Sequence, residues 1–516
     1  MHNNTWLIAI LLCCTPVLIC ADVIHVPADQ PTIQAGIDAA SNGDTVLLAD
    51  GTYTGPGNRD IDFLGKTITI RSQNGRDFCT IDCEADGDNP HRAFLLNSGE
   101  GPETVIEGLT LANGFAPELG GNYYYGGAIF CDGTSPTIRD NFFTGNIAWE
   151  HGGAISSWGG SPVITGNLFI QNAAEGGGAL YVQSGDVLVA NNTFIQNRAF
   201  LHGGGAVACS GQFTTVLVIN NLFVDNLDEY GYPDLGGGAL AAWTFSDVTV
   251  TNCTFLDNLS AGSGHAVFLS PYATLHVTDC ILWGNPNQVG YDYYAGDLPL
   301  VDYSIVQGGW TYNGTGNLNQ DPLLVTGPGG DHYLSHAAAG QPATSPALNT
   351  GSGPAQAVCW TLDGQAHCLD QYTTRTDEIR DAGTVDMGYH YPARSSVAAA
   401  LSCIPASGTL PFGCQMVVVL DNRYPETTRR LAARINVELA GGQNYSSWRA
   451  GFTNIAGGGS FSTSWVQNLP ALPSLLGHSR FTLVAEDVTP APWNQPPYLS
   501  SGDTGSATCQ VTGVAP

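Results

Sequence analysis

The chain has 516 residues, a formal net charge of −29 at pH 7 and only 16 lysines and arginines, with Lys66 as the single lysine. Nucleic-acid phosphates are bound by clustered cations, so this composition excludes a nucleic-acid partner and disfavours an anionic membrane surface. Beyond the first 21 residues, no stretch is long and apolar enough to predict a transmembrane span.

Residues 1–21 resemble a secretory signal peptide, with an apolar core at 6–19 and a small residue at the cleavage site, Ala21. We therefore expect export to an extracellular or cell-surface, outer-membrane-associated location. Of the 14 cysteines, those outside this segment would lie in an oxidising compartment. The candidate disulfides are Cys79–Cys83, Cys253–Cys280, Cys359–Cys368 and Cys403–Cys414.

Residues 27–40 are predicted to form a short amphipathic helix. Asp29 is placed to cap this helix, and Pro31 suits its first turn. Ile33, Ile37 and Ala40 share one face. Apolar segments with turn residues follow at 46–53 and 61–71. A helix placed before a stack of strands would cover the core and the unpaired backbone of the first strands.

From Gly126 to Val267 a short motif occurs six times: two small residues, an alanine and an aliphatic residue, followed by Phe-x-x-Asn or a degenerate form of it. The first copy begins at Gly126 and ends with Phe143 and Asn146. Its alanine, Ala128, recurs after 26, 25, 27, 33 and 27 residues. A period of this length is typical of a solenoid.

Each period contains three short apolar segments with strand-like alternation and no helix. Parallel strands in an α/β fold need about a dozen residues for each connection, and this period has no room for them. Three strands can instead form a triangular coil that stacks on the next coil at about 4.8 Å. The period therefore predicts a parallel β-helix.

Two columns of residues follow from this stacking, and we expect their asparagines to take left-handed backbone at turns and to bond from coil to coil. The first column is Asn146, Asn172, Asn197, Asn226, Asn258 and Asn285. The second column is Asn141, Asn167, Asn192, Asn221, Cys253 and Cys280. The two cysteines should therefore be neighbours in adjacent coils. The glycine pairs of the motif would supply another sharp corner.

The paired Gly-Gly-Ala-Ile and Phe-x-x-Asn motifs resemble the repeat of chlamydial polymorphic outer-membrane proteins, and more broadly the pectin-lyase-like β-helix superfamily. The resemblance covers about residues 22–392. It implies a right-handed parallel β-helix with an amino-terminal capping helix, and it implies no particular activity.

After Asn285 the period loosens, and we expect irregular final coils at 303–322 and a closing strand at 385–392. A linker at 393–399 would lead into residues 400–516, where alternating segments and turn signals suit an antiparallel β-sandwich. The segment that begins at Cys403 resembles the first strand of immunoglobulin-like bacterial modules. The predicted fold is all-β throughout, apart from the capping helix.

The pectin-lyase-like superfamily includes polysaccharide lyases, polygalacturonases and uronan epimerases, but their signatures are missing from this sequence. Asn-Thr-Asp, Gly-His-Gly and Arg-Ile-Lys do not occur, and His265 lies in Gly-His-Ala. Asp-Pro-His is approached only by Asp88-Asn89-Pro90-His91. No cysteine or histidine spacing suits zinc, so we expect no cofactor, with Ca²⁺ as the one metal considered.

Glu150 and Glu175 precede the glycine pairs of consecutive coils, so stacking would place them about 5 Å apart, flanked by His151 and His202. Two such carboxylates can bind Ca²⁺ through their oxygens, or act as nucleophile and acid on a glycosidic bond. The alternative is a row of solvated turn residues.

Aromatic side chains on the outer face and at the adjoining corner form a second candidate site. Its members are Tyr124, Phe130, Trp149, Trp158, Tyr181, Trp243 and Phe268. Phe130, Tyr181 and Phe268 would share one outward column, and Trp158 and Trp243 the next. Exposed rings suit stacking on a sugar or on a partner protein. The alternative is that an insert at 228–235 or the carboxy-terminal domain covers them.

These patterns favour an exported β-helix protein that acts in adhesion or in recognition of an extracellular glycan or surface protein, without catalysis. The second hypothesis is a secreted polysaccharide lyase or glycoside hydrolase with its site beside Glu150 and Glu175.

Overall fold

The computed structural model describes residues 21–116, 124–230, 236–292 and 297–393, and the backbone of seven strands between Val397 and Thr512. Residues 1–20 of the expected signal peptide lie outside the described residues. Among the helices of the described part, none has the length and hydropathy needed to cross a membrane.

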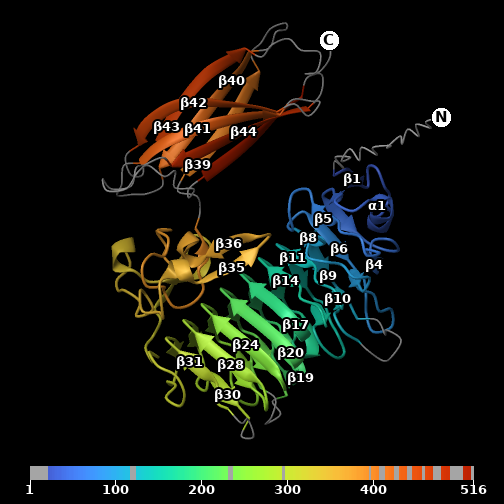
Figure 1. Ribbon diagram of the computed structural model, residues 1–516, viewed down its shortest axis with the longest axis vertical. Helices are drawn as coiled ribbons and strands as arrows, with labels where there is room; N and C mark the ends of the chain where they lie inside the picture. Colours follow the sequence, from blue (N-terminus) through green and yellow to red (C-terminus); the bar gives the residue numbers. More distant parts are fainter. Residues whose placement is uncertain are drawn as a thin grey trace, which may run out of the picture.

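Short parallel strands stack coil upon coil into a β-helix, which begins beside helix α1 (Ile33–Ala39; Figure 1). The largest described sheet takes two strands from most coils, and the long strands β17 and β20 join its two halves. Its strands are β1 (Val23–Val26), β2 (Thr45–Leu48), β4 (Ile61–Asp62), β5 (Thr69–Ser72), β7 (Phe94–Leu96), β8 (Val105–Glu107), β10 (Ile129–Asp132), β11 (Thr137–Arg139), β13 (Ile155–Trp158), β14 (Val163–Thr165), β17 (Leu180–Ala190), β20 (Val207–Ile219), β23 (Leu240–Ala242), β24 (Ser246–Thr251), β27 (Val267–Leu269), β28 (Thr274–Thr278), β30 (Val289–Tyr291) and β31 (Leu300–Asp302).

Two further parallel sheets form the other faces of the β-helix, and the smaller of them is present only in some coils. The second sheet contains β3 (Gly51–Tyr53), β6 (Cys79–Asp82), β9 (Thr110–Ala112), β12 (Phe142–Thr144), β15 (Leu168–Ile170), β18 (Thr193–Ile195), β21 (Leu222–Val224), β25 (Thr254–Leu256), β29 (Ile281–Trp283) and β32 (Ile305–Val306). The third sheet is smaller and contains β16 (Ala173–Gly176), β19 (Arg198–Gly203), β22 (Leu227–Asp228) and β26 (Leu259–Ser260). The predicted parallel β-helix is therefore confirmed.

The repeat builds the core of this β-helix directly. The phenylalanine of each coil stacks on the next, with ring centroids 4.5–4.8 Å apart and planes within 7° from Phe143 to Phe255. The aliphatic residues that follow each alanine are also fully buried. Because every coil repeats the same apolar positions, each side chain packs on its own counterpart one coil away.

The asparagine columns bond from coil to coil as expected. In the first column, Asn146 Nδ2 donates to Asn172 Oδ1 at 2.9 Å, and the pattern continues to Asn258. The expectation of left-handed backbone at these asparagines is wrong. The left-handed residue is the one before, such as Gln171 (φ 56°), because the turn must place the amide of the ladder asparagine inside the coil.

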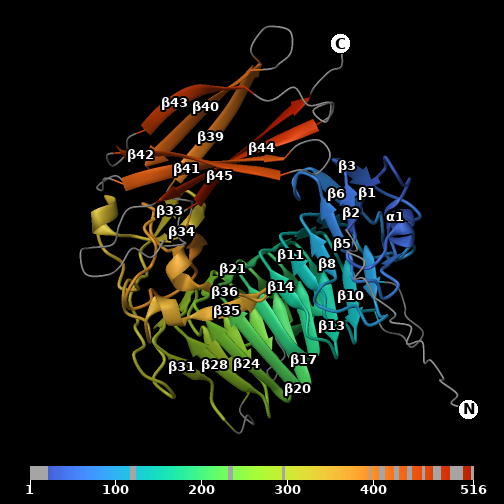
Figure 2. The same ribbon diagram turned by 45° about the horizontal axis from the view of Figure 1, so that its top comes forward.

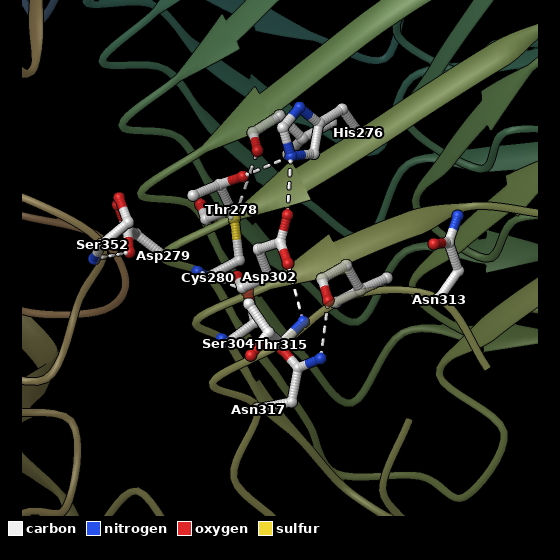
Figure 3. Close-up of polar contacts among 12 residues, drawn as sticks. His276, Thr278, Asp279, Cys280, Asp302, Ser304, Asn313, Thr315, Asn317 and Ser352 are labelled. Atoms are coloured by element: carbon white, nitrogen blue, oxygen red, sulfur yellow. Dashed lines mark hydrogen bonds and ion pairs between the residues drawn. The ribbon is translucent and has the colours of Figure 1, made fainter. Parts of the chain in front are cut away.

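The second column ends in Cys253, Cys280 and Ser304, which also accept from the backbone N–H of the preceding coil; Figure 3 shows Cys280 and Ser304. The backbone N–H of Asn221 faces Cys253 Sγ at 3.3 Å, and that of Cys253 faces Cys280 Sγ at 3.4 Å. The N–H of Cys280 then donates to Ser304 Oγ at 3.0 Å. The cysteines are neighbours, but the predicted disulfide between them is wrong, because each sulfur points along the ladder toward the preceding coil.

Helix α1 (Ile33–Ala39) covers the first coils, and it is shorter than the helix predicted at 27–40. Thr32, not Asp29, caps it, because the Thr32 hydroxyl accepts from the N–H of Ala35. Asp29 instead accepts from the N–H of His25 at 2.8 Å. Lys66 Nζ donates to the carbonyl oxygens of Ile37, Asp38 and Ala40, so the single lysine caps the end of this helix.

Residues 321–392, here called the strap, return along the outside of the coils (Figures 1 and 2). The strap contains β33 (Leu324–Gly327), β34 (Gly330–Leu334), η1 (Ala337–Ala339), η2 (Ala355–Ala357), β35 (Cys359–Leu362), β36 (Gln365–Cys368), η3 (Leu369–Gln371), β37 (Tyr372–Thr373) and β38 (Tyr391–Pro392). The closing strand expected at 385–392 is only β38, which pairs antiparallel with β37 rather than with a coil. Trp360, Leu369 and Val385 of the strap cover Ala190 and Ile219 of the β-helix.

Seven antiparallel strands follow the strap. One sheet contains β39 (Val397–Pro405), β40 (Gly413–Asn422) and β43 (Ser460–Asn468). The other contains β41 (Arg429–Glu438), β42 (Asn444–Ile455), β44 (His478–Asp487) and β45 (Thr504–Thr512). These strands agree with an antiparallel β domain, and β39 begins within the linker expected at 393–399. The side chains of Cys403 and Cys414 lie outside the described residues.

Of the two remaining predicted cysteine pairs, one forms a disulfide and the other does not. Cys359 and Cys368 form the predicted disulfide across hairpin β35–β36. Cys79 and Cys83 are both free and buried, so that predicted pair is wrong. They lie four residues apart at one extended strand, a span of about 13 Å, whereas a disulfide needs Cα atoms within about 7 Å.

Candidate functional site

The carboxylates and imidazoles singled out in the sequence meet at one corner of the β-helix. Glu150 and His151 lie just before β13, Glu175 lies in β16 and His202 in β19. A parallel bridge between His151 and Gly176 aligns the two coils. We call Glu150, His151, Glu175, His202, Tyr181 and Trp243 the corner cluster.

The corner cluster has a half-exposed rim and a buried floor. At the rim, His202 Nδ1 lies 3.8 Å from Glu175 Oε2, and the two side chains are 33% and 30% exposed. In the floor, the ring centroid of His151 lies 4.4 Å from that of Tyr181 and 5.4 Å from that of Trp243. Tyr181 and Trp243 are buried. A ligand could therefore reach Glu175 and His202 without any movement of the floor.

The surroundings change the protonation of several groups in the cluster. Burial, and then the neighbouring His202, lowers the pKa of His151 to about 3, so its imidazole is neutral at pH 7. Burial also lowers the pKa of His202. The pKa of Glu175 is raised by burial and then by the charge of Glu150. Burial raises the pKa of Tyr181 to about 12. Such shifts are typical of sites that bind or react.

Three polar atoms of the cluster are buried without a hydrogen bond of normal geometry: Glu150 Oε2, His151 Nδ1 and Trp243 Nε1. Buried polar atoms in proteins almost always have a partner, and an unpartnered carboxylate oxygen is costly. The concentration of three such atoms at one corner marks it as a place where a bound polar molecule would gain hydrogen bonds.

Gly176 allows the floor to form. A Cβ atom at this position would lie 2.4 Å from Trp243 Cη2 and 3.2 Å from His151 Nδ1. The glycine therefore lets the tryptophan ring lie flat against the coil beside the imidazole.

The predicted aromatic columns exist, but the expectation that they form an exposed face is wrong. Phe130 and Tyr181 lie in register in one column that ends at Phe268, and Trp158 lies in register with Gln183 in the next. Phe130, Tyr181 and Trp243 are only 5%, 4% and 8% exposed. Tyr125 and His151 pack over them, with the Tyr125 and Trp158 centroids 4.7 Å apart.

The corner aromatics differ from the columns. Trp149 is 53% exposed and makes edge contacts with Phe115 and Phe200, at centroid distances of 5.9 and 6.4 Å. Tyr124 is half-buried against a group of small alanines. Trp149 is thus the predicted ring that remains available beside Glu150 for stacking on a ligand.

A different row of exposed rings was not predicted from the sequence. Phe213, Phe245 and Tyr272 occupy the same turn of successive coils, with 88%, 49% and 73% exposure and positive φ values of 63°, 65° and 62°. The rings of Phe245 and Tyr272 stack at 5.5 Å. Gly133, Gly159 and Ser184 occupy this turn in earlier coils, so only the exchange of these small residues for aromatic ones could have signalled the row.

The sequence predicts Ca²⁺ binding as one role for Glu150 and Glu175. Among the described residues, the group of three or more potential ligands that converges within 4.8 Å is Asp381, Asp386 and His390 in the strap. Its atoms are already paired, since His390 Nε2 contacts Asp381 at 2.9 Å and Thr374 Oγ1 donates to Asp386 at 2.5 Å. Calcium binding between Glu150 and Glu175 stays a prediction.

A histidine–carboxylate contact also lies on the outer face of the last coils (Figure 3). His276 Nε2 lies 3.3 Å from Asp302 Oδ2 and 2.9 Å from the Thr278 hydroxyl. Asp302 Oδ1 accepts from the N–H of Thr315 at 2.7 Å. Asp302 thus fixes the irregular chain after β32 to β28, which accounts for the group as a structural contact.

A comparison with protein-family models matched residues 68–244 to the right-handed β-helix region. The match spans the coils from β5 to β23 and includes the corner cluster. Searches of curated proteins and of solved structures gave no match. The match agrees with a right-handed β-helix protein and specifies no activity, so the similarity to pectin lyases and to chlamydial proteins stays a prediction.

Proposed function

We propose that this protein is exported and recognises an extracellular glycan at the corner cluster. The observation that carries the proposal is the combination of a half-exposed rim, formed by Glu175 and His202, with unpartnered polar atoms on Glu150 and His151 directly beneath it. Hydroxyl groups of a sugar can donate to the carboxylates and to the neutral imidazole, while a sugar ring stacks on Trp149.

The form of the cluster suits a sugar better than a peptide or a phosphate. No lysine or arginine belongs to it, so a phosphate or sulfate would meet only Glu150 and Glu175 and be repelled. An acidic sugar would need a bridging cation such as Ca²⁺. A neutral glycan needs no such cation, and the apolar floor supports its C–H faces.

A second function, cleavage of the glycan, is favoured by the raised pKa of Glu175. A carboxyl group whose pKa is raised by burial and by a second carboxylate resembles the acid of a glycosidase pair, with Glu150 as the other member. Binding and cleavage use the same residues, so only turnover distinguishes them.

The test measures binding and turnover with the same glycans. Wild-type protein is titrated with xylan, β-glucan, alginate and pectate, with and without about 2 mM Ca²⁺, a concentration near extracellular levels. Each mixture is then assayed for new reducing ends and for unsaturated uronides. We expect binding of at least one glycan. Glu150→Gln with Glu175→Gln should weaken it about tenfold or more, because each charge-assisted hydrogen bond contributes about 1.5–3 kcal/mol.

Glu103→Gln is the matched control, since Glu103 is exposed and lies outside the corner. Loss of binding in the double variant but not in Glu103→Gln supports recognition at the corner. New reducing ends that disappear in the double variant support hydrolysis instead. Absence of binding to every glycan, or equal loss in both variants, would refute the proposal.

A further inference from the structure

A cleft of about 700 Å³ lies where the strap meets the β-helix, away from the corner cluster. Arg76, Arg139, Asp140 and Asn191 line it from the coils, and Tyr372 and Tyr391 line it from the strap. Its volume falls within the range of ordinary ligand sites, which is about 300–1,000 Å³. Figures 1 and 2 both place hairpin β35–β36 beside β11 and β14, at this junction.

Both sides of the cleft are held in place. Asp363 of the hairpin contacts Arg139 at 2.5 Å, and the Tyr372 hydroxyl accepts from Asn191 Nδ2 at 3.3 Å. Further along the strap, the N–H of His390 donates to Asn220 Oδ1 at 2.6 Å. The disulfide Cys359–Cys368 fixes the hairpin itself. The hollow is therefore a permanent feature between two anchored surfaces, and such preorganisation favours binding.

Arg76 and Asp140 supply fixed hydrogen-bonding groups at the β-helix side. Arg76 Nη1 donates to the carbonyl oxygens of Asn141 and Gly166 at 3.2 and 3.1 Å, which leaves its Nε and Nη2 without a recorded hydrogen bond among the described residues. The carboxylate of Asp140 lies over Gly166, where a Cβ atom would stand 2.4 Å from Oδ1. Asp140 is solvent-exposed.

Tyrosines supply the apolar side of the cleft. The rings of Tyr333 and Tyr391 stack with centroids 4.0 Å apart, and Tyr389 packs edge-on against Tyr391 at 4.9 Å. All three rings are held nearly buried. Rigid rings beside a few fixed polar groups are the usual composition of a site for a molecule with both apolar faces and hydroxyls.

The charge and the length of the cleft restrict the class of ligand that it can bind. In the lining, the charges of Arg76 and Arg139 are offset by Asp140 and Asp331, and Arg139 is also paired with Glu107 and Asp363, so an anionic ligand gains little. The lining runs from Arg76 past the turns at Asp140 and Asn191, and coils spaced at about 4.8 Å make this more than one sugar ring in length. We propose that the cleft binds an uncharged oligosaccharide segment, as a second site independent of the corner cluster.

The experiment uses the full chain and affinity electrophoresis in gels that contain arabinoxylan, mixed-linkage β-glucan or galactomannan. Asp140→Asn removes the carboxylate but keeps a side chain that tolerates the positive φ of 57°. Arg76→Gln removes the guanidinium. Asp132→Asn is the matched control, because Asp132 is exposed and does not line the cleft.

We expect at least one neutral polysaccharide to retard the wild-type protein. In the background of the double variant Glu150→Gln, Glu175→Gln, where the corner cluster no longer contributes, Asp140→Asn and Arg76→Gln should each weaken the remaining binding about tenfold, while Asp132→Asn leaves it unchanged. Thermal unfolding of each variant establishes that it is folded. The proposal fails if no neutral polysaccharide binds, if only a basic peptide or a polyanion binds, or if the control weakens binding as much as Asp140→Asn.

Discussion

At the scale of single residues, several positions outside the phenylalanine and asparagine columns depart from good packing and geometry. Phe213 is a bulky residue in the left-handed region, and its ring is 88% exposed. Glu150 Oε2 and His151 Nδ1 are buried without hydrogen bonds. Each departure costs stability and has no compensation in the core. Strain and unpaired polar atoms of this kind are concentrated at functional surfaces in proteins.

The cost at Phe213 can be measured directly. Asparagine tolerates left-handed backbone better than phenylalanine, so Phe213→Asn should raise the free energy of unfolding by about 0.5–1 kcal/mol in chemical denaturation. Phe245→Asn is the comparison, because its ring stacks on Tyr272 and its loss should cancel the gain. A clear loss of stability in Phe213→Asn would contradict this account.

At the scale of the elements, columns of stacked side chains connect neighbouring coils through hydrogen bonds. Asn192 Oδ1 accepts from the N–H of Asn167 in the preceding coil at 2.9 Å, and the N–H of Asn192 donates to Asn221 Oδ1 in the next coil at 2.8 Å. Every coil therefore has its turn tied to both neighbours. Cys253, Cys280 and Ser304 continue the column, so the requirement is for an acceptor of the right size and not for asparagine itself.

This requirement predicts unequal costs along the column. Asn192→Ala should lower the free energy of unfolding by about 3 kcal/mol or more, because it leaves several buried backbone groups unpaired. Cys253→Ser should cost less than about 1 kcal/mol, because a hydroxyl already serves this role at Ser304. Denaturant titrations of the two variants give the comparison, and equal costs would show that the ladder bonds are not what stabilises the turn.

At the scale of the whole molecule, the strap joins coils that are far apart in the sequence. Its tyrosines, its disulfide hairpin and Ser352 contact coils from β11 to β28. Asp279 makes one of these contacts: Oδ1 accepts from the N–H of Ser352 at 2.6 Å, and Oδ2 from its hydroxyl at 2.7 Å. The cleft exists only because these contacts hold the strap against the coils.

The contact at Asp279 should depend on pH. Burial raises the pKa of Asp279 above 3.8, its ordinary value, so the folded protein retains this proton over a range where the unfolded chain has lost it. Stability from this group is therefore present below pH 3.8 and is lost as the pH rises through the folded pKa. Asp279→Asn should raise the unfolding temperature at pH 7. This gain should vanish at about pH 3.5, close to the pKa of an aspartate in the unfolded chain.

Asp186→Asn, at an exposed aspartate, should leave the unfolding temperature unchanged at both pH values. A variant Asp279→Asn that is less stable than wild type at pH 7 would show that the charge of Asp279 is compensated in the fold.

Much of the β-helix could be predicted because its sequence repeats with a recognisable period. The phenylalanine stack, the coil-to-coil asparagine bonds and the columns of Phe130 and Tyr181 follow from period and alternation alone. The predictions that were wrong depend on distances and directions. Cys79 and Cys83 are near in sequence but extended, the sulfurs of Cys253 and Cys280 follow the ladder, and Thr32 rather than Asp29 meets the helix end.

The candidate sites also contain features that the period predicts and features that it does not. The approach of Glu150 and Glu175 was predicted from the period, but the burial of Tyr181 and Trp243 was not, because Tyr125 and His151 cover them from a different coil and column. No periodicity links Arg76 and Asp140 to Tyr372 and Tyr391, since the strap that brings them together has no repeat.

The repeat is enough to specify the coil, because a side chain in a repeating stack meets mainly its own counterpart one period away. The open surfaces follow instead from how distant segments pack together: the exposed row at Phe213, the half-exposed rim of the corner cluster and the cleft beneath the strap. These surfaces depend on contacts between segments of unrelated sequence, and local periodicity carries no information about such contacts.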